Sequence, residues 1–231
     1  MYSKSGMKQR VLLTGKDGID LLQRISTLDF ARVLPEVRQP GLILNPQGKI
    51  LCYFEVERKA VPNQLEISFD DQFLELLERY TFSERYQIVH LDPMNSIEAQ
   101  DSELQRILAR IPKLGNEFLN NGETNPLEIN LQSAIHDQKG CYPGQEVLEK
   151  IIAIGSPSKR LCLVKVIADE RESSAGLEIK VPLELDDGVG RLTSFVAPYG
   201  LAIVRKTHAA ANSVLHASQA CVRLINLTNA E

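Results

Sequence analysis

The sequence predicts an α+β protein in which helices cover a sheet, followed by a small C-terminal β region. Up to about residue 111, short apolar runs alternate with segments whose apolar residues recur at helical spacing. After Lys159, short β-type runs divided by Gly, Asp and Pro follow at spacings of about a dozen residues, typical of a small barrel or sandwich. The length of 231 residues, with 43% hydrophobic and 24% charged residues, fits an ordinary globular protein.

After a short apolar stretch at 11–13, the N-terminal part is expected to form a helix that Asp17 caps. Its apolar residues recur at helical spacing, at Ile19, Leu22, Ile25 and Leu28. Turn-forming pairs that contain Pro, Gly and Asn then bracket apolar runs at 42–44 and 50–56. These runs predict two paired strands, and residues 64–69 predict a third.

A second helix is expected from Asp70 onward. Its apolar residues follow helical spacing, at Phe73, Leu74, Leu76, Leu77 and Tyr80. Asp70 and Asp71 would then lie in the first turn, where a carboxylate interacts favourably with the helix dipole. A strand at 86–91 should follow, ended by Asp92 and Pro93.

A third helix is expected at 101–111, stopped by Pro112, which cannot continue a helix. A linker at 155–158, rich in Gly, Ser and Pro, then precedes the β region. We therefore predict two domains, 1–157 and 158–231. The strands expected in the second domain lie at 161–167, 177–183, 189–196 and 200–205.

Composition excludes several classes of protein. With 26 basic and 30 acidic residues the net charge is -4, so no broad attraction to nucleic-acid phosphates is expected. The N-terminus lacks the apolar segment of a signal peptide, and the longest apolar runs are far shorter than the roughly 20 residues of a membrane span. No membrane association is therefore expected, and the cytoplasm, or an organelle matrix, is the expected location.

The cysteines are Cys52, Cys141, Cys162 and Cys221, and they are far apart in the chain. No pair has the spacing of zinc or cluster ligands, so reduced thiols and no metal site are expected. A nucleotide-binding glycine motif is also absent from the sequence, which argues against nucleotide-driven phosphoryl transfer.

The most informative segment is residues 139–146, which read KGCYPGQE. Pro143 has the fixed φ of the second position of a type II turn, and Gly144 accepts the positive φ of the third, so a turn is expected after Tyr142. Cys141, preceded by Gly140, would then lie at the edge of a loop.

A helix that starts near Gln145, together with the cation of Lys139, would favour the thiolate of Cys141 and make it reactive. Glu146 opposes this effect, because a nearby carboxylate raises the pKa of a thiol. The alternative is that Cys141 is a small buried hydrophobic residue, as most free cysteines are. A further alternative is a cysteine hydrolase in which a histidine, such as the nearby His136, is the partner of Cys141.

The eight residues KGCYPGQE resemble the signature of the YgfZ family of folate-binding proteins. The surroundings agree, since residues 125–131 resemble the family's approach to this motif, and Gly155 with residues 159–161 resembles the segment after it. Residues 15–29 resemble the start of family members, and residues 190–194 (GRLTS) resemble an element of their C-terminal domain. The resemblance therefore spans nearly the whole chain.

The resemblance implies an aminomethyltransferase-like folate-binding region of two subdomains, followed by a small six-stranded C-terminal β-barrel. It implies tetrahydrofolate, or a derivative, as the bound cofactor. It also implies an accessory function in the assembly or repair of iron-sulfur clusters, including those of radical enzymes that modify tRNA. In that function Cys141 and Lys139 would be the chemical groups, and iron-sulfur client proteins or cluster carriers would be the partners.

Several polar groups near the motif suit the donor and acceptor edge of a pterin. The residues expected to bind folate are Glu128, Asn130, Tyr142, Gln145 and Glu146. The carboxylates and amides would hydrogen-bond the ring, and Tyr142 would stack on it or anchor the loop. The alternative for each polar group is simple solvation in a loop.

One departure from the aminomethyltransferase relatives bears on activity. They have an aspartate pair after an N-x-x-G turn, whereas residues 45–48 (NPQG) here lead to Cys52 and Tyr53. A thiol and a phenol do not supply the anionic carboxylate of aminomethyl transfer. A tetrahydrofolate-dependent aminomethyltransferase or demethylase acting on a small amine is therefore the second hypothesis, and a thiol-bearing module without folate is the third.

Overall fold

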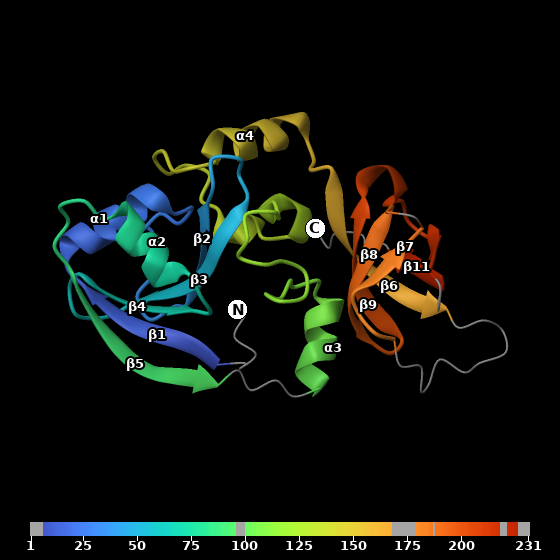
Figure 1. Cartoon of the computed structure of the whole chain (residues 1–231), viewed down its shortest axis with the longest axis horizontal. Coiled ribbons are helices and arrows are strands. Elements are labelled where there is room, and N and C mark those ends of the chain that lie inside the picture. Colours follow the sequence, from blue (N-terminus) through green and yellow to red (C-terminus); the bar gives the residue numbers. More distant parts are fainter. Residues whose placement is uncertain (1–6, 96–99, 168–178, 187, 218–220, 226–231) are drawn as a thin grey trace. The chain divides into compact units, whose positions relative to one another are not determined.

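A computed structural model describes residues 7–95, 100–167, 179–186, 188–217 and 221–225 (Figure 1). The chain separates into two compact units. The first contains the residues up to Ile97, Leu119–Pro126 and Leu131–Ile151, and the second contains Glu98–Phe118, Leu127–Asn130 and the residues from Ile152. These two units are defined by how the chain packs and carry no functional assignment. The predicted functional domains, 1–157 and 158–231, and the two predicted subdomains therefore stay predictions.

The first unit is built on an antiparallel sheet of five strands in the order β2-β3-β4-β1-β5. The strands are β1 (Met7–Thr14), β2 (Gln39–Leu44), β3 (Ile50–Arg58), β4 (Gln64–Phe69) and β5 (Gln87–Asn95). The strands predicted at 42–44, 50–56 and 64–69 are therefore confirmed. Alternate residues of each strand point to opposite faces, so the two faces have different chemistry.

One face of this sheet is apolar and is covered by α1 (Lys16–Ile25) and α2 (Phe73–Tyr80), as Figure 1 shows. Cys52, Phe54 and Val56 of β3 are fully buried in this core. Leu21, Leu22 and Ile25 of α1 are buried in the same core, so the helical spacing of apolar residues in the sequence correctly identified the buried side.

The predicted cap of the first helix and the predicted first turn of the second helix are wrong. The N-cap of α1 is Gly15, with φ 133°, and the Asp17 carboxylate lies in the first turn, where it accepts a hydrogen bond from the Arg85 backbone. Asp70 and Asp71 precede α2, whose N-cap is Gln72. The Asp71 carboxylate instead accepts a hydrogen bond from the Asn120 amide at 2.8 Å. Contacts with distant parts of the chain thus replaced the local caps.

Two predicted ends also differ from the structure. β5 continues through Pro93 to Asn95, because it is an edge strand and a bulge places Asp92 and Pro93 opposite Gln9. Helix α3 (Gln100–Leu108) ends earlier than the predicted residue 111. Arg110, after its end, has a positive φ of 55°, which a helix does not allow.

The second unit contains an antiparallel sheet in the order β10-β11-β6-β9-β8-β7. Its six strands are β6 (Lys159–Ile167), β7 (Leu183–Leu185), β8 (Gly190–Val196), β9 (Tyr199–Arg205), β10 (Val214–His216) and β11 (Cys221–Ile225). The strands predicted at 161–167, 189–196 and 200–205 are confirmed. Of the strand predicted at 177–183, residues 177 and 178 lie outside the described residues, and the strand that the structure has begins only at Leu183.

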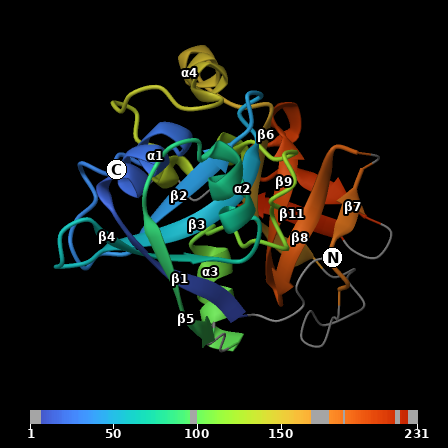
Figure 2. The ribbon, with the colours of Figure 1, turned by 60° about the vertical axis from the view of Figure 1, so that its left-hand side comes forward.

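This sheet curls almost into a barrel (Figure 2). Its two edges meet where the Asp186 backbone N–H donates to the His216 carbonyl at 2.9 Å and the His216 N–H donates to the Asp186 carboxylate at 2.9 Å. The interior is filled by residues from all six strands: Val164, Val166, Leu185, Leu192, Ala202, Val204, Leu215, Val222 and Leu224. On the outer side, Ile107 of α3 packs on Leu161, Leu163 and Leu201.

The chain thus combines helices with two antiparallel sheets, as the α+β class requires. Among the described residues, no helix is both long and apolar enough to cross a membrane.

Candidate functional site

The KGCYPGQE segment lies in the first unit, after the short helix η2 (Gln132–Ala134), and its last two residues begin helix α4 (Gln145–Ile154), which Figure 1 labels. Helix α4 begins at Gln145, as predicted. The predicted turn is confirmed: the Gln145 N–H donates to the Tyr142 carbonyl at 3.3 Å, and Gly144 has φ 83°. We call residues 135–144 the Cys141 loop.

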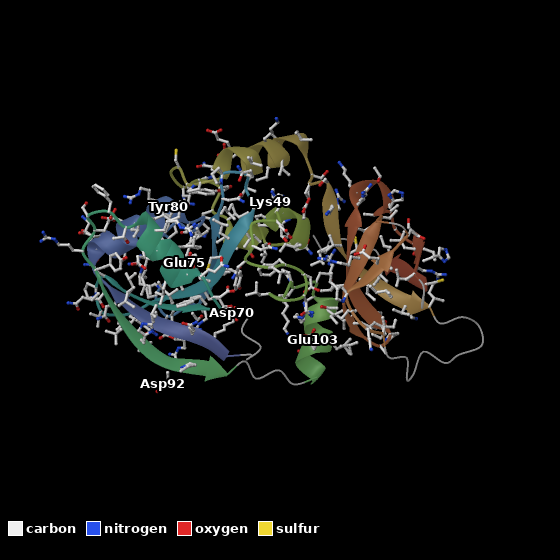
Figure 3. The ribbon with its side chains drawn as sticks, viewed as in Figure 1. Lys49, Asp70, Glu75, Tyr80, Asp92 and Glu103 are labelled. Carbon is white, nitrogen blue, oxygen red and sulfur yellow. The ribbon has the colours of Figure 1, made fainter. Side chains whose placement is uncertain are left out.

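The end of the Cys141 loop is fixed by close packing on the β2–β3 turn. A Cβ atom on Gly144 would lie 2.5 Å from the Asn45 carbonyl oxygen and 2.9 Å from the Cα of Gly48. The Asn45 side chain shapes this turn, because its Oδ1 accepts hydrogen bonds from the backbone N–H groups of Gln47 and Lys49, the latter labelled in Figure 3. Only glycine fits at position 144, both for space and for backbone conformation.

Lys139 fixes the loop a second time, at the C-terminal end of α1. Its side chain is only 7% exposed. The Nζ donates to the carbonyls of Gln23 at 2.5 Å and Leu28 at 3.0 Å, and also to that of Ser26. An ammonium group has three N–H donors, so these three carbonyls account for all of them.

The start of the loop is hydrogen-bonded to residues 27 and 29, just after α1. The Thr27 hydroxyl donates to the Ala134 carbonyl, and the His136 N–H donates to the Thr27 carbonyl at 3.0 Å. The Asp29 N–H donates to Nδ1 of His136 at 2.9 Å, and burial lowers the pKa of this imidazole, with Asp29 opposing the shift. Nδ1 of His136 is therefore engaged by the backbone, which does not favour His136 as a catalytic base.

Lys139 and Tyr142 shield each other inside the loop. The Nζ lies 5.2 Å from the centre of the Tyr142 ring, at cation–π distance, and this ring is 9% exposed. Burial lowers the pKa of Lys139 to about 8, with Asp29 opposing the shift. Burial also raises the pKa of Tyr142 to about 12, and Glu149 adds to that increase. Of the two predicted functions of Tyr142, this position supports the anchoring one.

Cys141 lies between the two fixed ends, and it is the one cysteine in the described part of the chain that is exposed. Gly140 is exposed as well, with no atom within 4 Å of a Cβ built on it. The alternative prediction, a small buried hydrophobic residue, is therefore wrong for Cys141 and describes Cys52 instead. All four cysteines are free thiols.

The residues expected to bind folate fall in both units. Gln145 and Glu146 lie in the first turn of α4, where the Gln145 amide donates to Glu149 at 2.7 Å and Glu146 is exposed. Glu128 and Asn130 belong to the second unit. Glu128 lies in η1 (Pro126–Ile129) and accepts a hydrogen bond from the Ser158 hydroxyl at 2.8 Å. Asn130 is exposed, with φ 63°.

Cys52 and Tyr53, the two residues that the sequence singled out after the 45–48 turn, point to opposite faces of β3. Burial, with the charges of Asp71 and Asp70, raises the pKa of the Cys52 thiol far above its usual range. Burial and Glu55 likewise raise the pKa of Tyr53, whose hydroxyl donates to Glu55 at 3.3 Å. Both groups are therefore neutral near pH 7, which agrees with the argument that neither replaces a carboxylate.

The face of the sheet that carries Tyr53 holds a network of charges that sequence reasoning missed. At its centre Glu66, 6% exposed, accepts from Arg10 at 2.8 Å, Arg38 at 3.0 Å and Lys59 at 2.7 Å. Lys8 pairs with Glu55 at 2.9 Å on the same face. The signal was present, because polar residues alternate with apolar ones along β3 and β4.

Within the part of the chain that the structure describes, no group of three or more His, Cys, Asp or Glu side chains is arranged to hold a metal ion. The candidate site is the Cys141 loop, because it presents an exposed thiol between two fixed ends.

The chain matches no protein-family model and no curated protein sequence. Among solved structures it is similar to the glycine cleavage system aminomethyltransferase T of Bartonella henselae, with a TM-score of 0.76 and 13% sequence identity. The similarity covers 96% of this chain and 84% of the Bartonella chain. The fold of this protein is accordingly that of a glycine cleavage aminomethyltransferase, over nearly its whole length.

Proposed function

We propose that this protein is a folate-binding accessory protein of the YgfZ type, which acts in the cytoplasm in the assembly or repair of iron-sulfur clusters through Cys141. Its clients would be iron-sulfur proteins or cluster carriers, including radical enzymes that modify tRNA. The aminomethyltransferase fold supports folate binding, and the KGCYPGQE segment supports the YgfZ type.

The observation that carries the proposal is the exposure of Cys141 between two fixed ends of one loop. A thiol must be accessible to exchange with a partner's disulfide or to ligate the iron of a cluster that a partner carries. It must also be held in place for a defined partner to find it, and the Lys139 and Gly144 anchors provide this.

The residues assigned to folate suit the chemistry of a pterin. A carboxylate has about four acceptor positions, and the hydrogen bond from Ser158 uses one of those on Glu128. Glu128 is 9% exposed, so a hydrogen bond to a pterin N–H there would be well shielded from water. Asn130, Gln145 and Glu146 offer further amide and carboxylate groups. Bound tetrahydrofolate would supply a one-carbon acceptor nitrogen, while Cys141 would supply the thiol.

The test is complementation of a YgfZ-deficient strain with the wild type and with Cys141→Ser. We expect the wild type to restore the activity of iron-sulfur enzymes and Cys141→Ser to fail at equal protein levels. Cys162→Ser is the matched control, because Cys162 is half-buried and burial raises the pKa of its thiol. Full complementation by Cys141→Ser would contradict the proposal, as would the absence of tetrahydrofolate binding in a calorimetric titration.

The fold also favours a second candidate, a tetrahydrofolate-dependent aminomethyltransferase or demethylase acting on a small amine. The neutral Cys52 and Tyr53 count against it. The two candidates separate when the purified protein is incubated with tetrahydrofolate and small aminomethylated amines, or with methylated amines and an added two-electron acceptor. Enzyme-dependent formation of methylenetetrahydrofolate would establish the transferase and remove the accessory function.

A further inference from the structure

We propose that Lys139 is a positioning residue, whose ammonium closes the C-terminal end of α1 and thereby holds the Cys141 loop in place. The inference concerns control of the same loop, and its biological meaning rests on the proposed function. From the sequence, Lys139 was expected to act chemically together with Cys141. In the structure its ammonium instead binds backbone carbonyls at the end of α1.

The end of α1 needs such a partner. The last four carbonyls of a helix have no N–H donor within the helix. A glycine in the left-handed conformation commonly follows the helix and lets the next backbone N–H groups donate to these carbonyls. Helix α1 lacks that motif: its C-cap is Ser26, in an extended conformation, and Thr27 follows. The Ser26 hydroxyl and N–H both donate to the Leu22 carbonyl. The Lys139 ammonium satisfies the carbonyls of Gln23 and of Ser26.

A cation is suited to this position for a second reason. The C-terminal end of a helix carries a partial negative charge, which favours a positive group there. The Lys139 ammonium also lies over the Tyr142 ring, so burial of the loop and capping of the helix occur together. Packing therefore joins Lys139 and Tyr142 to the last turn of α1 in one cluster, and Gly140 and Cys141 lie outside this cluster.

The charges around Lys139 come from several elements. Asp29, in the segment after α1, favours the ammonium, but it is shared with Arg32 at 3.3 Å. His136, on the loop itself, is close enough for Lys139 to lower its pKa. Burial is the largest influence on Lys139 and brings its pKa to about 8. Because the pKa of the docked Lys139 is lowered, raising the pH through about 8 favours the docked side chain over a released one, although the neutral amine donates two hydrogen bonds in place of three.

Loss of this contact should increase the mobility of Cys141. Lys139 precedes Cys141 by two positions, and the buried Tyr142 and the packing of Gly144 on the β2–β3 turn hold the chain after Cys141. Without the ammonium, one end of the exposed segment is released while the other stays in place. The motion of the thiol should therefore increase even though the sheet and helices of the unit are unchanged.

The experiment measures this motion with a nitroxide spin label on Cys141. The half-exposed Cys162 and Cys221 are first changed to Ser, and the buried Cys52 is kept. Electron paramagnetic resonance then reports the mobility of the label at several values between about pH 6.5 and pH 9.5. The variants are Lys139→Met, Lys139→Arg and, as a matched control, Lys150→Met on the exposed side of α4.

We expect Lys139→Met to shorten the correlation time of the label by about twofold or more at neutral pH. In the parent protein the mobility of the label should not rise as the pH passes about 8, because deprotonation at a lowered pKa favours the docked side chain. Lys139→Arg keeps a cation that can donate to carbonyls and should leave the label closer to the parent than Lys139→Met does. Lys150→Met should behave as the parent does.

A folded Lys139→Met protein whose label mobility equals that of the parent would overturn the proposal. If Lys139→Met does not fold, Lys139→Gln, whose amide donates two hydrogen bonds in place of three, takes its place with the same expected increase in mobility. The readout requires neither folate nor a cluster. Failure of the proposed function would appear in complementation by Cys141→Ser and would leave the label data unchanged.

Discussion

Each unit of this protein holds an irregular segment in place with a buried charge, but the two charges are compensated differently. In the second unit Glu117 is fully buried and faces Arg106 at 3.0 Å. In the first unit the ammonium of Lys139 contacts neutral carbonyls at the end of α1. The comparison shows that the consequence of removing a buried charge depends on what is left behind.

Around Glu117 every acceptor is used. Oε1 accepts from the hydroxyls of Thr193 at 2.7 Å and Ser194 at 2.6 Å, and Oε2 accepts from the Lys113 N–H at 2.9 Å and from Arg106. Arg106 lies on α3 and also pairs with Glu103, which Figure 3 labels. Removing Glu117 would leave part of a guanidinium charge buried without its partner. Removing Lys139 would leave carbonyls near an exposed loop, which water can reach.

The largest effect is therefore expected for Glu117→Ala. We expect it to lower the free energy of unfolding of the second unit by about 3–5 kcal/mol, because Arg106 and two hydroxyls lose a buried acceptor. Denaturant titration followed by circular dichroism measures it. Glu123→Ala is the control, since Glu123 is exposed and should change stability by less than about 0.5 kcal/mol. Equal effects of the two substitutions would break the comparison.

Gly144→Ala tests the other anchor of the Cys141 loop. We expect a loss of about 2–4 kcal/mol, because the new Cβ would meet the Asn45 carbonyl at 2.5 Å and the backbone has φ 83°. Gly155→Ala is a matched control, with φ 95° and no atom within 4 Å of the new Cβ, and should lose only about 1 kcal/mol. Thermal unfolding of both variants would show whether close packing adds to the conformational term.

The pH dependence of stability sharpens the comparison at Lys139. Its pKa is about 8 in the folded protein against 10.5 for an ordinary lysine. Between these values the unfolded chain binds a proton that the folded chain has released, so raising the pH favours the folded state. Relative to Lys139→Met, the wild type should gain on the order of 1 kcal/mol between about pH 8 and pH 9.5, reduced by solvent near the loop.

Urea titrations of both proteins at matched pH values measure this gain, and comparison with the variant cancels the titration of other groups. A wild type that loses stability relative to Lys139→Met over this range would show that the pKa of Lys139 is raised, with the carbonyls and the Tyr142 ring dominating over burial.

The smallest effect is expected for Cys141→Ser. The side chain is exposed and the substitution is nearly isosteric, so the free energy of unfolding should change by less than about 0.5 kcal/mol. Cys52→Ser, in which a hydroxyl replaces a fully buried thiol, should lose more than 1 kcal/mol, roughly, and is the contrasting variant. Similar melting temperatures for the two variants would contradict the assignment of Cys141 to the surface.

Regular elements were predicted well where the spacing of apolar residues was clear, as along α1 and in strands β3, β4, β8 and β9. Helix ends were predicted poorly, because a side chain that could cap its own helix was used elsewhere. Asp71 binds Asn120, far along the chain, and Asp17 binds the Arg85 backbone. A contact between distant residues was missed at Thr193 and Ser194 too. The sequence singled out their segment, but it did not indicate that both hydroxyls donate to the buried Glu117.

The sequence by itself determined the helices and strands with clear apolar spacing, the turn at Pro143 and Gly144, and the presence of one unusual cysteine segment, because each depends on residues that are neighbours in the chain. Tertiary structure alone decided that Cys141 is exposed while Cys52 is buried, and that the Lys139 cation lies on α1. These outcomes depend on which distant groups meet, and the burial and hydrogen bonding that result are properties of the packed chain and of no short segment within it.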